Sequence, residues 1–230
     1  MPPPDDNPRK GAGDPGPFPY LTRGIDSLVG RFSAAPSLQE EPRKDTQAKK
    51  PIDNDAAHPA KKPTTAQVRE INGLIKAKRY QQALDKTVEY YGIDTSSVNG
   101  KITYDPKVDS GGKTSADRKV RFGNGTFTLS DSGAAFTATS VLHEVSHANA
   151  IKLHGYPGDK PADKNTQEWA AYEVMAYRAE LTHADELGLS KDRKDATQKS
   201  LDGYLGVLTK PNRKLVDGGQ YWDMKSDEER

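Results

Sequence analysis

Two histidines four residues apart, with a glutamate directly after the first, form the pattern with the most specific chemistry: His143-Glu144-Val145-Ser146-His147. In a helix, residues four apart lie on one face about one turn apart, so both imidazoles can bind one metal ion. Glu144 lies about 100° further round the helix, where its carboxylate can take a proton from a water that zinc activates and pass it to a leaving amine. The pattern predicts a Zn²⁺ site with His143 and His147 as metal ligands and Glu144 as catalytic base.

The alternative interpretation is a pair of structural histidines beside a solvated glutamate. Only 5 of the 230 residues are histidine, so a chain of this composition contains the pattern by chance about 0.005 times. Leu142, Val145 and Ala148 also give the predicted helix one apolar side, while both histidines share another side. These observations favour the metal site.

A catalytic zinc site needs a third protein ligand and keeps its fourth position open. His154 lies about 10 Å beyond His147 along the same helix, too far to bind the same ion. Glu168 opens the run 168–177 and is the first choice, because His/His/Glu is a common catalytic zinc set. Glu173 stands in the same Glu-x-x-Ala-Tyr context and is kept as the alternative.

The elements that must position these residues are mainly helical. We predict an active-site helix over 134–153, a helix over 166–187 that ends at Gly188, and a helix over 191–208 that ends before Pro211. Three β-rich runs precede the active-site helix and predict a small antiparallel sheet. These runs are 102–104, 120–122 and 126–129. The expected fold class is therefore α+β, a mainly helical domain with a small antiparallel sheet before the active-site helix.

The pattern along the chain divides it into four parts. Residues 1–63 are rich in Pro, Gly, Asp and Lys with few large apolar side chains, which predicts a disordered leader. Residues 64–96 predict a helical hairpin that starts with Thr65 as N-cap and ends at Gly92. Residues 97–210 form the predicted zinc metallopeptidase domain. Residues 211–230 are expected to be a tail in which Tyr221 and Trp222 are the anchor.

Composition excludes several classes of function. The net charge is +1, so no strong field favours nucleic acid or anionic lipid, and we expect neither a nucleic-acid nor a membrane partner. The chain has no cysteine, which leaves histidine and carboxylate as metal ligands. The N-terminus lacks the basic and apolar regions of a cleaved signal peptide. We expect a protein made in the cytoplasm and, if exported or injected, moved without such a signal.

The zinc motif followed by a helix-borne glutamate about twenty residues later resembles the gluzincin group of metallopeptidases. Residues 120–127, 140–148 and 168–172 together resemble the metallopeptidase domains of bacterial polymorphic toxins and injected effectors, over about residues 100 to 190. The resemblance implies a zincin-like α+β domain and two histidine ligands with a downstream glutamate. It also implies that a strand before the active helix, at Thr126 to Leu129, binds substrate as an added strand. Some gluzincins carry an aspartate four residues after the glutamate ligand, and Tyr172 stands at that position after Glu168.

The expected function is that of a zinc-dependent endopeptidase, a bacterial toxin or effector that cleaves a protein in a target cell. The leader fits a segment that engages secretion or injection machinery. Two alternatives stay open. One is an intracellular regulatory metallopeptidase, and the other is a non-catalytic interaction module in which zinc only stabilises the fold.

Overall fold

A computed structural model describes residues 57–109, 111–129, 133–157 and 166–221. The predicted leader, up to residue 56, lies outside these ranges. The helices of the described residues are α2 (Thr65–Lys76), α3 (Tyr80–Tyr91), α4 (Gly133–His154), α5 (Thr166–Thr182), α6 (Ala184–Leu187), α7 (Lys191–Val207) and α8 (Lys210–Asp217). The strands are β1 (Thr103–Tyr104), β2 (Gly112–Thr114) and β3 (Val120–Phe122), followed by a short 3₁₀ helix, η1 (Asn124–Thr126). The predicted fold class is confirmed: a mainly helical domain with a small sheet before a long helix.

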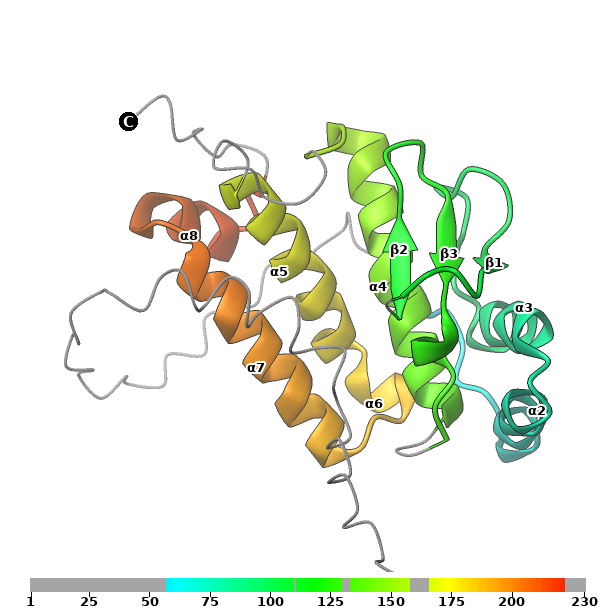
Figure 1. Ribbon diagram of the computed structural model, residues 1–230. Helices are drawn as coiled ribbons and strands as arrows, with labels where there is room; N and C mark the ends of the chain where they lie inside the picture. Colours follow the sequence, from blue (N-terminus) through cyan, green and yellow to red (C-terminus); the bar gives the residue numbers. More distant parts are fainter. Residues whose placement is uncertain (1–56, 110, 130–132, 158–165, 222–230) are drawn as a thin grey trace, which may run out of the picture.

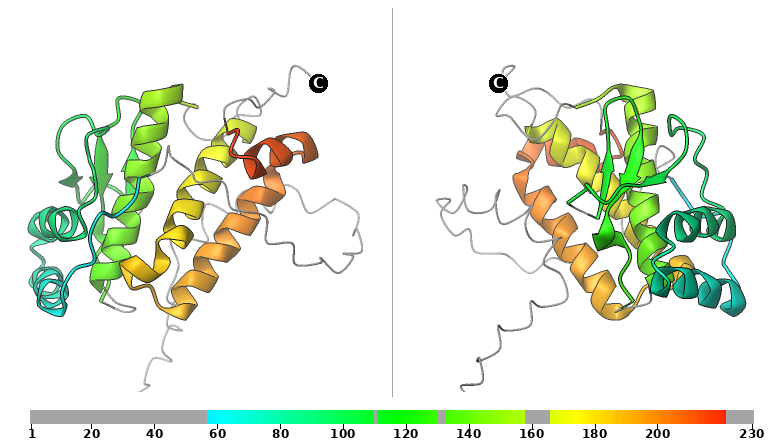
Figure 2. Two further views of the ribbon diagram at one scale, coloured as in Figure 1. Left: turned by 180° about the vertical axis from the view of Figure 1, so that it is seen from behind. Right: turned by 45° about the vertical axis from the view of Figure 1, so that its right-hand side comes forward.

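The long helix α4 is the centre of the molecule. It packs against α5 on one side and against the sheet and the α2–α3 hairpin on the other, while α7 lies against the far side of α5 (Figure 1). The same order is visible from behind and from the side (Figure 2). The side chains of Val141, Leu142 and Val145 are completely buried. Because α4 is enclosed on both sides, the direction of each of its polar side chains is determined by packing.

The hairpin forms where the sequence predicts it, with one change at its start. Thr64 rather than Thr65 is the N-cap. The hydroxyl of Thr64 accepts from the backbone N–H of Gln67, and the side-chain oxygen of Gln67 accepts from the backbone N–H of Thr64 at 2.8 Å. Gly92 ends α3 with φ of 62°, as a left-handed residue at a helix end should. The side-chain oxygen of Asn72 accepts from the N–H of Ala134 at 2.8 Å, so the hairpin also satisfies the first turn of α4.

The sheet is mixed rather than antiparallel. Its strand order is β1-β3-β2, in which β2 and β3 form an antiparallel pair and β1 runs parallel to β3. β2 lies between the first two β-rich runs, where the sequence predicts no strand. The predicted strand at Thr126 to Leu129 is wrong, because η1 covers its start. The ring of Phe127 stacks on Tyr80 of α3 at 4.4 Å between centroids, so this segment packs on the hairpin and leaves the sheet.

The C-terminal part of the described chain has one helix break and one additional helix that the sequence does not indicate. The single helix expected over 166–187 is two helices, α5 and α6, which break at His183. Pro211 does not end the helical region but lies in the first turn of α8. Proline is tolerated there because the N–H that proline lacks has no partner within the helix at this position. Tyr221 is buried and its hydroxyl accepts from Arg178 at 3.0 Å. Trp222 lies outside the described residues.

No helix among the described residues has the length and apolar character required to cross a lipid bilayer.

Candidate metal centre

His143 and His147 converge on one point beside α4. Their Nε2 atoms lie 3.0 Å apart, and their rings meet edge to face at 4.7 Å between centroids. The four-residue spacing brings the rings together because α4 is an unbroken helix from Gly133 to His154. The two ring nitrogens face each other at this distance and both side chains are largely buried, so they form part of a candidate metal site.

Glu173 of α5 supplies the third donor. Its Oε2 lies 3.4 Å from Nε2 of His143 and its Oε1 lies 3.6 Å from Nε2 of His147. One donor atom from each of the three residues fits within a group no wider than 4.8 Å. Tetrahedral zinc with ligands at about 2.1 Å separates its donor atoms by about 3.4 Å, which is close to the 3.0 Å between the two Nε2 atoms and the 3.4 Å between Nε2 of His143 and Oε2 of Glu173. The two imidazoles and one carboxylate are also a donor set that zinc prefers.

Glu168, the first choice from the sequence, is not part of this group. It lines a separate pocket of about 200 Å³ together with His154 and Tyr221. Glu168 and Glu173 are five residues apart, which places them about 140° apart around α5, so only one can face the histidines. The identical local context of the two glutamates carries no information on which of them faces α4. The structure therefore supports the alternative, Glu173.

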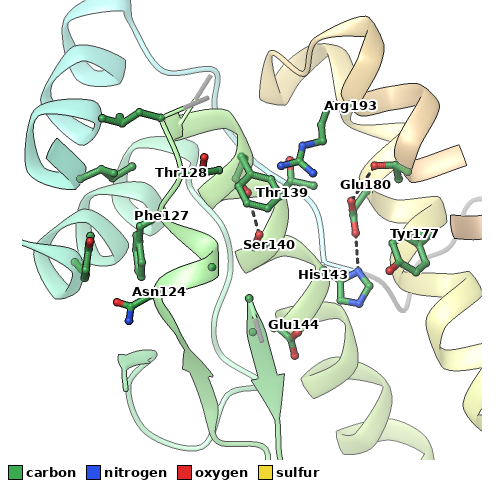
Figure 3. Close-up of a pocket in the computed structure, with 18 of the residues that line it drawn as sticks. Asn124, Phe127, Thr128, Thr139, Ser140, His143, Glu144, Tyr177, Glu180 and Arg193 are labelled. Atoms are coloured by element: carbon green, nitrogen blue, oxygen red, sulfur yellow. Dashed lines mark hydrogen bonds and ion pairs between the residues drawn. The ribbon is translucent and has the colours of Figure 1, made fainter. Parts of the chain in front are cut away.

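Glu180 is a functional side chain that the sequence reasoning missed. It is 6% exposed, and its Oε1 lies 2.6 Å from Nδ1 of His143, the ring nitrogen opposite the metal-facing one (Figure 3). The hydroxyl of Thr197 on α7 donates to its other oxygen at 3.5 Å. A carboxylate behind a histidine ligand orients the ring and keeps its proton on Nδ1, so that Nε2 can bind the metal. The sequence does contain an indication of this residue. Glu180 follows Glu173 by seven residues, so both lie on the same face of one helix, two turns apart.

Glu144 lies next to this group and is held by β2. It is 9% exposed, and the hydroxyl of Thr114 donates to its Oε2 at 2.7 Å. Gly112 of the same strand faces the glutamate closely: a Cβ atom there would lie 2.7 Å from Cγ and 2.8 Å from Oε1 of Glu144. Burial raises the pKa of Glu144, although its contacts with His143 and Thr114 oppose this. A carboxylate with a raised pKa is a stronger base, which suits proton transfer near neutral pH.

The two histidines differ in their electrostatic surroundings. Burial lowers the pKa of His147 to about 4, so its ring is neutral at physiological pH. Burial also disfavours the charged form of His143, but the carboxylates of Glu173 and Glu180 outweigh it and raise the pKa of His143 well above its ordinary value. The carboxylates thus attract positive charge to the point that the Nε2 atoms face.

A pocket of about 720 Å³ opens at this centre (Figure 3). His143, Glu144 and Glu173 form part of its wall, so a molecule that enters can reach the three side chains. Tyr177, one turn after Glu173, also lines the pocket, and its ring meets His143 edge to face at 4.8 Å between centroids. The centre is therefore accessible, in contrast to a structural metal site that is closed by four protein ligands.

No family model matches the chain, and searches of the curated proteins and of the solved structures return no match either.

Proposed function

We propose that this protein is a zinc-dependent endopeptidase. The observation that carries the proposal is the group of His143, His147 and Glu173, which has Glu144 beside it and a pocket in front of it. Three protein ligands with an open fourth position are the arrangement of catalytic zinc, whereas structural sites have four protein ligands.

The chemistry divides between the ion and the chain. Zinc bound to these residues would lower the pKa of a water molecule and polarise the carbonyl group of the substrate. Glu144 takes the proton of the attacking water and returns it to the leaving amine. Thr114 holds the glutamate by its hydrogen bond, while Glu180 orients the ring of His143. Strand β2 is an edge of the sheet next to Glu144, which makes it the position where a substrate could pair as an added strand.

Three measurements on purified protein test this proposal. The chain should bind about one zinc ion, and His143→Ala should lose it. Glu144→Gln should keep both the zinc and the fold but lose cleavage of a denatured protein substrate, because only the base is removed. If Glu144→Gln retained its full biological effect, the protein would instead be a non-catalytic module that zinc stabilises. The conclusion would also be a non-catalytic module if the zinc-loaded wild-type protein cleaved no polypeptide.

We further propose that the substrate is a protein of a target cell and that the chain is delivered there as a toxin or effector. This part rests on the resemblance of residues 120–127 and 140–148 to toxin and effector metallopeptidases, and on the Pro-rich composition of residues 1–63. Expression inside a susceptible cell should be toxic for the wild type and harmless for Glu144→Gln. Deletion of residues 1–60 should abolish export. Normal export of the truncated chain, with a substrate found in the producing cell, would favour the intracellular regulatory peptidase.

A further inference from the structure

We infer that the substrate segment bound in the 720 Å³ pocket is acidic, with a carboxylate side chain close to the cleaved bond. This inference rests on the proposed peptidase function and specifies its substrate class. It depends on how charge is distributed over the described residues that line the pocket.

All acidic residues among the described lining residues belong to the metal centre. They are Glu144, Glu173 and Glu180, and each already has a partner there. The other charged residues in the described lining are Lys76, Lys78 and Arg193, all of which are basic. Beyond the metal centre, the charges that a bound peptide meets on the described lining are therefore positive.

Arg193 places this charge one helical turn before Thr197, whose hydroxyl donates to Glu180 of the metal centre. It comes from the first turn of α7, is only 3% exposed, and its guanidinium is directed toward α4 (Figure 3). The central guanidinium carbon lies 3.6 Å from the ring centroid of Phe136, which keeps the planar group in one orientation. A guanidinium held in this way presents a delocalised positive charge that attracts a carboxylate. Its low exposure also strengthens the attraction, because water screens the charge poorly there.

The part of the pocket lined by the turn between α2 and α3 also carries positive charge, but there the charge is on exposed lysines. Lys76 and Lys78 lie at the exposed turn between α2 and α3. Part of the pocket wall is apolar: Phe127 is stacked on Tyr80, and Leu129 is 49% exposed. The wall fits a segment in which an apolar residue separates two acidic ones. The lysine end is exposed, so salt should weaken its contribution more than that of Arg193.

Cleavage of paired peptides tests the inference. Zinc-loaded wild-type protein digests a proteome-derived peptide library to locate the preferred positions. Peptides with Glu or Asp at those positions are then compared with the same peptides carrying Gln or Asn. We expect kcat/KM to be about tenfold or more higher for the acidic member of each pair, as for a charged hydrogen bond near the reacting group.

Three variants assign the preference to the residues named. Arg193→Met should reduce the acidic preference near the cleaved bond, and Arg193→Lys should keep part of it. Because a buried arginine can be required for folding, the exposed double variant Lys76→Gln/Lys78→Asn is a second test on the same pocket. Asparagine is chosen because Lys78 has φ of 57°, which asparagine tolerates. Lys199→Gln, exposed on α7 and outside the described lining of the pocket, is the matched control and should cleave like the wild type.

The outcomes separate the two proposals. Cleavage without a preference between acid and amide overturns the inference and leaves the peptidase function standing. If no peptide is cleaved, the proposed function fails, and the binding of fluorescent acid and amide peptides to zinc-loaded Glu144→Gln decides the inference alone. Tighter binding of the acidic peptide, lost in the double lysine variant, supports it. Equal binding of both peptides overturns it.

Discussion

The Nδ1 atom of His143 lies 2.6 Å from Oε1 of Glu180, while the Nε2 atom of the same ring lies 3.4 Å from Oε2 of Glu173. The two carboxylates are seven residues apart on α5, so both face α4 from one side of the helix. One imidazole is therefore held between two glutamates with different tasks. Glu173 completes the donor group on the Nε2 side of the ring, and the carboxylate of Glu180 holds the ring from the Nδ1 side.

Glu180→Gln should weaken zinc binding by about 10–100-fold, because an amide orients and polarises the histidine less than a carboxylate does. Competition with a chromogenic chelator measures the affinity. Glu186→Gln is the matched control: Glu186 also contacts a histidine, with its Oε2 2.7 Å from Nδ1 of His183, but this pair lies outside the metal centre. Equal zinc affinities for Glu180→Gln and the wild type would exclude the orienting role.

Glu173→Ala and Glu168→Ala distinguish the two glutamates that the sequence offers as third ligand. Glu173→Ala should lose most of its zinc after dialysis, because only two histidines remain of the donor group. Glu168→Ala should keep its zinc, since this residue lines the separate pocket with His154 and Tyr221. Metal content is measured by atomic absorption on both variants. The reverse result would make Glu168 the ligand.

Gly112→Ala should separate metal binding from catalysis. The added methyl group would lie 2.7 Å from Cγ of Glu144 and 2.7 Å from the ring of Phe122, so the glutamate or the strand must move. A displacement of about 1 Å costs on the order of 100-fold in rate. Zinc content should not change, because the three donors lie on α4 and α5. Gly111→Ala is the control, since among the described residues its Cβ meets only Thr126, at an ordinary 3.7 Å. Unchanged kcat for Gly112→Ala would show that the position of Glu144 is not critical.

The parts that the sequence predicts well are those whose signal is local. The spacing of His143 and His147 determines their convergence, because any continuous helix places residues four apart on one face. The hairpin and its end at Gly92 are also predictable, since a left-handed glycine after an amphipathic stretch marks a helix end.

The parts that the sequence does not predict depend on contacts between distant segments. The choice between Glu168 and Glu173 follows from which face of α5 packs on α4, and the two local contexts are the same. The strand expected at Thr126 to Leu129 does not form, because Phe127 packs on Tyr80 of the hairpin, which lies 47 positions earlier in the chain. Strand β2 is short and begins with glycine, so its composition resembles a turn, and its pairing with β3 forms the strand.

Alkaline pH should destabilise the fold through its buried tyrosines, and Tyr91 is the clearest case. It is 1% exposed, and burial raises its pKa from 10.0 to about 12. Below pH 10 the phenol is neutral in both states, so its contribution to stability is complete. As the pH rises from 10 toward 12, the unfolded chain loses the proton first, and the free energy of unfolding falls by up to about 1.4 kcal/mol per pH unit. Tyr91→Phe has no such proton. Its free energy of unfolding, measured with urea at pH 8, 10 and 11, should therefore fall less steeply with pH than that of the wild type. If the free energy of unfolding of Tyr91→Phe fell as steeply with pH as that of the wild type, Tyr91 would not keep its proton in the folded state.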